Sequence, residues 1–252
     1  MALKELREKL KWLDPFTYVD LYLMPRINPS KNEYVSIAVY LVSAFVFAWL
    51  IYTALGFAFG TGSPMVIVMS GSMEPLYHRG DVIVLFGTGR TGVNAPEISL
   101  DVPSLKGVSF SQIGETIPGT ATFENPIQAI KFGNGTEIPI QKNGSIVVYY
   151  SSLTQQPIIH RAVAKIHVSD GDYLLTKGDS IYNPTIDQDC GRISSLGTEK
   201  PCITLYPVPV KQVQGISVFQ IPFVGCFKLW IFDDLAGLIG SGKLPADFKG
   251  VC

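Results

Sequence analysis

A long uncharged apolar run stands near the start of the chain. Between residues 34 and 59 there is no charged side chain, and most positions are Val, Ala, Phe, Leu or Ile. As a helix this run would be about 39 Å long, which exceeds the roughly 30 Å thickness of a hydrocarbon core. Core helices of soluble proteins seldom stay uncharged over such a length. The pattern therefore predicts a transmembrane anchor at 34–59.

Basic residues flank this run on one side only. Several Lys and Arg residues precede it, whereas none follows until Arg79. The excess of positive charge on the cytoplasmic side of membrane proteins predicts a cytoplasmic N-terminus and an extracytoplasmic chain after Gly60. The run is longer than the roughly 7–15 apolar residues of a cleaved signal peptide, and residues 1–33 precede it. An uncleaved anchor is therefore expected.

Residues 1–33 form the expected cytoplasmic segment. Leucines recur at helical spacing within 3–13, which predicts a short amphipathic helix that either lies on the membrane surface or packs on its neighbours. Residues 14–33 contain Pro15, Pro25 and Pro29 and are expected to form an irregular connector.

The apolar runs shorten after the anchor and are separated by Gly, Pro, Asn and Asp. Segments with strand-like composition occur at 65–69, 81–86, 145–150, 158–168, 173–176 and 210–218. These segments show no helical periodicity, so the fold class is predicted to be mostly β. We expect an antiparallel, barrel-like β domain over 60–86 and 144–225.

Residues 87–143 interrupt this pattern and are rich in Gly, Thr, Ser and Pro. They are expected to form an inserted lobe or a long hairpin. Asn134 and Asn143 each begin an N-glycosylation sequence, and each is followed by glycine. Because Asn-Gly is a strong hairpin signal, we expect a turn to be the main role of both.

The C-terminal segment, 226–252, begins within an apolar stretch at 216–232 that Gln220, Pro222 and Lys228 interrupt. This stretch is short for a membrane span, so it predicts a strand followed by an interfacial apolar segment. Of the four cysteines, Cys190 and Cys202 enclose a polar loop and are expected to form a disulfide in an oxidising compartment. Cys226 and Cys252 have no evident assignment.

Composition narrows the classes of function. The chain is 47% hydrophobic but only 16% charged, which agrees with a membrane segment. The net charge of -1 and the lack of a basic patch give no reason to expect a nucleic-acid partner. The spacing of Cys and His matches no zinc pattern. We expect neither a metal nor a cofactor.

Candidate chemistry begins at Ser70-Gly71-Ser72-Met73-Glu74-Pro75, directly after a predicted strand. A serine hydroxyl is a weak nucleophile until a base takes its proton, and a carboxylate commonly orients that base. The possible bases are three histidines and two lysines, and the possible carboxylates are three aspartates of one polar segment. These candidates are His78, His160, His167, Lys165, Lys177, Asp179, Asp187 and Asp189.

Four sequence blocks occur in order behind the anchor and resemble those of type I signal peptidases of the archaeal and endoplasmic-reticulum kind. The blocks are 70–75, Gly144-Ser145-Ile146-Val147-Val148-Tyr149, Ile159-His160-Arg161-Ala162-Val163, and Thr176-Lys177-Gly178-Asp179 continuing to Asn183-Pro184-Thr185-Ile186-Asp187. Residues 79–84 also match the strand that follows the nucleophile in that family. The bacterial branch has a lysine where this chain has His160, so the resemblance is to the Ser-His branch.

The resemblance implies a role for five residues. Ser72 matches the nucleophile and His160 the general base. Asp187 matches the carboxylate at the end of the last block, and Asp179 matches the aspartate of its Gly-Asp pair. Ser70 matches a serine whose hydroxyl assists the oxyanion hole.

The sequence departs from the family at two of these blocks. Residues 180–183 are longer than the usual run to the second aspartate, so the choice among Asp179, Asp187 and Asp189 stays open. Gly144-Ser145 stands where Gly-Asp is more usual.

The implied activity is that of a membrane-bound serine endopeptidase, which removes signal peptides from secreted precursors after small residues through an acyl-enzyme. The implied partners are signal-peptide-bearing precursors, the lipid membrane and the protein-export channel, at the cell membrane or the endoplasmic-reticulum membrane. The substrate is expected to pair as an added strand beside 65–69 and 144–149. The alternatives are a Ser-Lys enzyme using Lys165 or Lys177, a membrane-anchored non-catalytic β domain that binds exported proteins, and a glycosylated surface protein.

Overall fold

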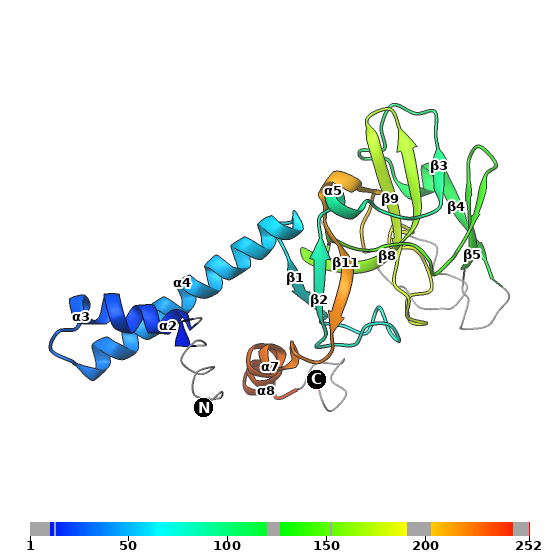
Figure 1. Cartoon of the computed structure of the whole chain (residues 1–252). Coiled ribbons are helices and arrows are strands. Elements are labelled where there is room, and N and C mark those ends of the chain that lie inside the picture. Colours follow the sequence, from blue (N-terminus) through cyan, green and yellow to red (C-terminus); the bar gives the residue numbers. More distant parts are fainter. Residues whose placement is uncertain (1–10, 13, 120–126, 152, 191–202, 244–251) are drawn as a thin grey trace, which may run out of the picture. The chain divides into compact units, whose positions relative to one another are not determined.

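A computed structural model describes residues 11–12, 14–119, 127–151, 153–190, 203–243 and 252. The chain divides into two compact units, Met1–Ala58 and Phe59–Cys252. The first unit is helical and the second is built mainly of strands (Figure 1).

Helix α4 (Glu33–Phe59) dominates the N-terminal unit and coincides with the predicted anchor. It has 27 residues and is long and apolar enough to cross a membrane. At its start the side chain of Asn32 accepts a hydrogen bond from the Tyr34 amide at 3.0 Å, which satisfies one of the free donors of the first turn. Ser43 is its one buried residue, as expected for a helix whose sides face lipid.

The segment before α4 is helical, so the predicted irregular connector is wrong. It consists of α2 (Pro15–Tyr18), the π-helical turn η1 (Val19–Leu23) and α3 (Met24–Ile27). Pro15 and Pro25 stand in the first turns of α2 and α3, where the missing N–H would have no helical partner in any case. The predicted amphipathic helix at 3–13 lies outside the described residues, apart from residues 11 and 12.

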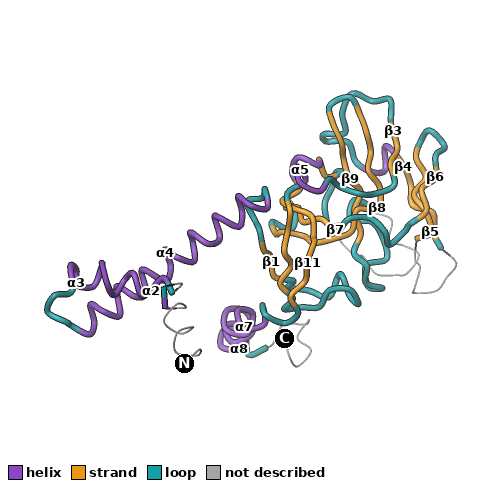
Figure 2. The backbone as a smooth tube through the Cα atoms, in the orientation of Figure 1, coloured by secondary structure: helices purple, strands orange, loops and turns teal. Residues whose placement is uncertain are grey.

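An eight-stranded sheet forms the larger part of the second unit (Figure 2). Seven of its strands follow one another as β1-β2-β11-β7-β8-β9-β10, with every neighbouring pair antiparallel, and β3 adds to β8 in parallel. The strands are β1 (Met65–Ile67), β2 (Val82–Phe86), β3 (Glu97–Ser99), β7 (Ile146–Ser151), β8 (Gln156–Val168), β9 (Gly171–Lys177), β10 (Val208–Pro209) and β11 (Val213–Ile221).

The described part of this sheet does not close into a barrel. Strands β1 and β10 end the path and pair only with β2 and β9. Barrel closure needs hydrogen bonding between the two end strands, and these have only three and two residues. The prediction of an antiparallel β fold is confirmed, whereas its barrel-like closure is wrong.

The segment 87–143 contributes short elements and a second sheet. Helix α5 (Thr88–Thr91) and α6 (Phe110–Ile113) accompany a three-stranded sheet of β4 (Gly114–Pro118), β5 (Ile127–Phe132) and β6 (Glu137–Pro139). Ile130 and Phe132 of this sheet join Ile166 and Leu175 of the main sheet in one apolar core. At the predicted Asn134-Gly135 turn, the Phe132 amide donates to the Thr136 carbonyl and Gly135 has φ +85°, which favours glycine.

The last predicted strand is shifted along the chain. Residues 210–212 form the 3₁₀ turn η2 (Val210–Gln212), and β11 extends beyond the predicted Val218 to Ile221. A helical segment follows, made of α7 (Cys226–Leu229), the π-helical turn η3 (Trp230–Asp234) and α8 (Leu235–Ser241). Leu229 and Asp234 are buried, whereas Phe227 and Trp230 are 74% and 60% exposed.

The cysteines of this segment are paired. Cys226 forms a disulfide with Cys252, although the sequence indicated no assignment for either. Cys190 is also disulfide-bonded. Its predicted partner, Cys202, lies outside the described residues, so that pairing stays a prediction.

Candidate active site

Ser72 lies in a loop between β1 and β2 that is held at both ends. The Val68 amide donates to the Asp81 carbonyl at 2.9 Å, and the Gly80 amide donates to the Val68 carbonyl at 2.8 Å. Within the loop, the side chain of Met73 is fully buried and packs in an apolar cluster beside the sheet. Because Met73 is fixed inward, the adjacent Ser72 is directed to the half-buried outer side of the loop.

The loop after β9 supports the backbone of Ser72. The Ser180 amide donates to the Ser72 carbonyl at 3.0 Å. A Cβ atom on Gly178 would lie 2.7 Å from the same carbonyl oxygen and 2.8 Å from the Asn183 side chain. Glycine is therefore required at position 178 for the two loops to approach this closely.

His160 and Asp187 form a buried pair. His160 stands on β8 opposite Val147 of β7, and its Nδ1 lies 2.7 Å from Oδ2 of Asp187. The two side chains are each 2% exposed. An Nδ1 proton donated to the carboxylate leaves the lone pair of the imidazole on Nε2, which is the form that accepts a proton from a nucleophile.

The same oxygen of Asp187 accepts two further hydrogen bonds. The Tyr149 hydroxyl donates to it at 2.9 Å and the Thr176 hydroxyl at 2.7 Å. Burial, and next the negative charge of Asp187, raise the pKa of Tyr149 well above its usual value. Tyr149 is thus a stable donor that keeps the carboxylate oriented.

The backbone of Asp187 is also fixed. Its amide donates to the Thr176 carbonyl at 2.8 Å. Gln188 reinforces this junction, because its side-chain oxygen accepts from the Thr176 amide at 3.0 Å. The loop after β9 therefore returns to β9 at Thr176 and brings Asp187 to His160.

Asp179 and Asp189 have other partners. Asp179 forms a buried ion pair with Arg161, whose Nη2 lies 2.5 Å from Oδ2. Arg161 also donates from Nη1 to the Gly144 carbonyl at 2.8 Å. Asp189 accepts from the Thr116 hydroxyl at 2.9 Å. Of the three aspartates that the sequence left open, it is Asp187 that contacts His160.

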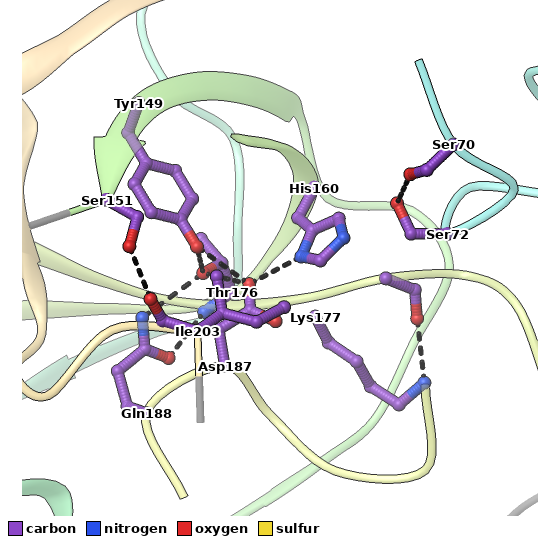
Figure 3. A network of polar contacts seen from close by, with 11 residues as sticks. Ser70, Ser72, Tyr149, Ser151, His160, Thr176, Lys177, Asp187, Gln188 and Ile203 are labelled. Carbon is purple, nitrogen blue, oxygen red and sulfur yellow. Dashed lines mark hydrogen bonds and ion pairs between the residues drawn. The ribbon is translucent and has the colours of Figure 1, made fainter. Parts of the chain in front are cut away.

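Of the other possible bases, Lys177 stands in the same region as Ser72 and His160 (Figure 3), whereas His78, His167 and Lys165 have other surroundings. His78 is exposed. His167 lies 2.8 Å from Asp172 and 3.3 Å from Glu97, and Lys165 forms an ion pair with Glu97 at 3.1 Å. The ammonium of Lys177 donates to the Gly178 carbonyl at 2.8 Å.

Ser70 and Ser72 lie on the side of the His160 imidazole that faces away from Asp187 (Figure 3). The Ser70 hydroxyl donates to the Ser72 hydroxyl oxygen at 3.4 Å. No hydrogen bond joins Ser72 to His160, but Nε2 of His160 points away from Asp187 and toward Ser72 (Figure 3). Such contacts in unliganded enzymes are often long and shorten when substrate binds.

Sequence reasoning missed several residues that hold this site together. Arg161 and Gly144 occur in the matched blocks, yet only the structure shows that they bind each other. Tyr149, Thr176 and Gln188 surround Asp187, and nothing in their sequence spacing marks them as its partners. Among the residues that the structure describes, no group of three or more His, Cys, Asp or Glu side chains is arranged to hold a metal ion.

A buried histidine–carboxylate pair is one part of a Ser-His-Asp site, whose other part is a serine hydroxyl. Signal peptidase complex catalytic subunit SEC11 of the Saccharomyces cerevisiae strains YJM789, RM11-1a and JAY291 is 25% identical to this chain over 207 residues, covering 79% of this chain and 88% of the relative. No protein-family model matches the chain. The chain is a homologue of these peptidase subunits, which confirms the predicted resemblance to type I signal peptidases of the Ser-His branch.

Proposed function

We propose that this protein is a membrane-bound serine endopeptidase that removes signal peptides from exported precursors after small residues. The observation that carries the proposal is the buried His160–Asp187 pair, whose free ring nitrogen points toward Ser72. Homology to signal peptidase catalytic subunits supports the choice of substrate.

The chemistry uses Ser72 as nucleophile, His160 as general base and acid, and Asp187 as the carboxylate that stabilises the imidazolium. The Ser72 hydroxyl attacks the scissile carbonyl while Nε2 of His160 takes its proton, and Asp187 stabilises the resulting imidazolium. His160 then gives this proton to the leaving amine, which is the new N-terminus of the mature protein, so the mature protein departs and the signal peptide remains as an ester on Ser72. A water activated by His160 hydrolyses the ester and releases the signal peptide.

The oxyanion formed during attack needs donors that are already in place. The proposed donors are the Ser72 amide and the hydroxyl of Ser70, which is 3.4 Å from the Ser72 hydroxyl oxygen. When a carbonyl binds, the Ser70 hydroxyl turns from Ser72 to the new oxyanion. Loss of such a donor typically costs about 3 kcal/mol of transition-state stabilisation.

The substrate is proposed to bind in extended form along β1, which ends the main sheet. Pairs of residues along β1 and β2 alternate in their hydrogen bonding. The Leu85 amide donates to the Pro64 carbonyl and the Val68 amide donates to the Asp81 carbonyl. Val66 stands midway between Pro64 and Val68, so its backbone groups also face β2. The backbone groups of Met65, Ile67 and Met69 therefore face the open edge. Strand β7 pairs with both β11 and β8, so the expected second strand of contact at 144–149 is not open from Val147 onward.

The membrane arrangement follows the predicted topology. Helix α4 anchors the protein with its N-terminus in the cytoplasm, and the second unit works outside. Its partners are signal-peptide-bearing precursors, and the protein-export channel that delivers them is expected nearby.

The test is cleavage of a precursor carrying an Ala-x-Ala site by the purified full chain in lipid. Wild type should cut after the second alanine, and Ser72→Ala and His160→Ala should each be inactive. His167→Ala serves as the control, because that histidine lies in a separate surface cluster. If His160→Ala stays active while Ser72→Ala does not, the base is Lys177 or Lys165. If folded wild type cuts no precursor, the non-catalytic binding domain replaces this proposal.

A further inference from the structure

The disulfide between Cys226 and Cys252 lies directly against the end of the Ser72 loop. A Cβ atom on Gly80 would be 2.2 Å from Sγ of Cys226 and 2.3 Å from Sγ of Cys252. Gly80 has φ +90°, a conformation that also favours glycine. The two sulfur atoms therefore occupy the space that any side chain at position 80 would need.

A buried ion pair ties the same place to the C-terminal helical segment. Nη2 of Arg79 lies 2.7 Å from Oδ1 of Asp234, and the two side chains are 7% and 4% exposed. Arg79 also donates from Nη1 to the backbone oxygen of Cys252. Arg79 is thus bonded both to the helical segment that begins at Cys226 and to Cys252, which the disulfide joins to that segment.

Asp81 completes these attachments from the other side. It is fully buried, and its carboxylate accepts from the His78 amide at 2.7 Å, the Gln220 side chain at 2.6 Å and the Phe223 amide at 3.1 Å. In addition, the Gly225 amide donates to the Gly80 carbonyl at 2.8 Å. Residues 79–81 are therefore held by the end of β11 and by the segment that follows it.

Residues 79–81 are directly connected to the loop that carries Ser72. Gly80 and Asp81 are the residues that bond Val68 and so close the Ser72 loop. Tyr77 stands four positions before Asp81 and packs with Met73 in the apolar cluster beside the Ser72 loop. A shift of residues 79–81 would thus move the loop that carries the hydroxyl.

We propose that the C-terminal segment, residues 226–241 together with Cys252, is a disulfide-closed clamp that positions the Ser72 loop. Arg79, Asp234, Cys226 and Cys252 are then positioning residues that never touch substrate. The catalytic part of this inference rests on the proposed function, whereas the structural part does not. Loss of the clamp should lower kcat and leave KM unchanged, because β1 keeps its own pairing with β2.

The expected loss in kcat is about 10- to 100-fold, since misplacing a reacting group by about 1 Å costs on the order of 10²-fold. The variants are Asp234→Asn and the double change Cys226→Ser with Cys252→Ser. Asp234→Glu keeps the charge and should restore most of the rate. Glu97→Gln is the matched control, because it removes an ion pair with Lys165 in the surface cluster of β3, β8 and β9.

Amide hydrogen exchange of the full chain in lipid provides a readout that does not depend on activity. In the two clamp variants, exchange should accelerate at residues 68–81 and stay as in wild type in β8 and β9. Acceleration over the whole second unit would overturn the proposal, because the segment would then act on global stability alone. Unchanged exchange at 68–81 would overturn it as well.

The two proposals fail separately. If wild type cleaves no precursor, the function proposed above is lost, yet the exchange pattern still decides whether the clamp exists. If wild type cleaves and the clamp variants keep their kcat, the function stands and the positioning role is rejected. A fall in kcat with KM unchanged, together with local exchange, supports both.

Discussion

Asp187 and Asp179 are buried carboxylates of one loop, but their partners give them different expected effects. Asp187 contacts the imidazole of His160, whereas Asp179 neutralises Arg161. In Asp187→Asn the charge that stabilises the imidazolium is lost while the packing is nearly kept. We expect kcat to fall on the order of 10³- to 10⁴-fold.

Asp179→Asn is the contrasting variant. It leaves the guanidinium of Arg161 buried without its counter-charge, which typically costs about 3–5 kcal/mol of stability. Urea unfolding of both variants, combined with precursor cleavage, measures the difference. A larger loss of unfolding free energy in Asp187→Asn than in Asp179→Asn would contradict these assignments.

Tyr149 gives a prediction in the alkaline range. Its pKa is raised well above the ordinary 10.0, first by burial and then by Asp187. The folded protein therefore holds this proton more tightly than the unfolded chain, and stability falls as the pH rises above about 10. Unfolding free energies at pH 9 and 11 should show a steeper loss for wild type than for Tyr149→Phe.

The exposed Tyr182 supplies the control for this measurement, since it is 73% exposed. Tyr182→Phe should follow wild type over the same pH interval. Equal slopes for wild type and Tyr149→Phe would show that the hydroxyl of Tyr149 is not buried against Asp187. At neutral pH, Tyr149→Phe removes one bond to a charged acceptor and should cost about 1.5–3 kcal/mol, in stability or in kcat.

At the scale of single elements, β1 allows a test of substrate pairing. Ile67 directs its backbone groups to the open edge of the sheet, whereas Val66 directs its own to β2. Proline lacks the N–H donor, so Ile67→Pro should raise KM by removing a bond to the extended substrate. Val66→Pro should instead break the β1–β2 ladder and lower the unfolding temperature.

Steady-state kinetics on one precursor and thermal unfolding distinguish these two outcomes. Ile67→Pro should have a higher KM and a nearly unchanged unfolding temperature. Val66→Pro should mainly have a lower unfolding temperature. A normal KM in folded Ile67→Pro would mean that the substrate does not pair along β1.

The same elements show what a single sequence can and cannot predict. The bounds of helix α4 agree with the predicted run at 34–59 within one residue, because an uncharged run of that length has few alternatives to a helix. Most strands were also found, since β-branched runs between turn residues report local preference. The partner of His160 stayed open because Asp179, Asp187 and Asp189 stand in one polar loop. Only the return of that loop to Thr176 decides which of them arrives at His160.

Contacts between distant segments were beyond the reach of the sequence for a related reason. Arg79 and Asp234 are separated by 155 positions, and neither lies in a pattern that would indicate its partner. Barrel closure was wrongly expected because strand count and alternation say nothing about the length of the two end strands. The Arg79–Asp234 contact and the closure of the sheet both depend on tertiary packing, which the periodicity of a sequence does not indicate.

At the scale of the whole molecule, the charge asymmetry around α4 predicts which side of the membrane each unit faces. Lys31 and Arg26 lie just before the helix, and the positive-inside bias is strongest for charges this close to a span. Ser30→Cys and Asn134→Cys place single reactive thiols at exposed positions of the two units. In intact cells, a membrane-impermeant maleimide should label the second variant and not the first.

Permeabilised cells complete this experiment, because both variants should then react equally. Wild type measures the background, and its described cysteines are all disulfide-bonded. Labelling of Ser30→Cys alone in intact cells would place Ser72 and His160 in the cytoplasm. A precursor whose cleavage segment has crossed the membrane could then not bind this site. The inverted topology would therefore refute the proposed function as well as the orientation.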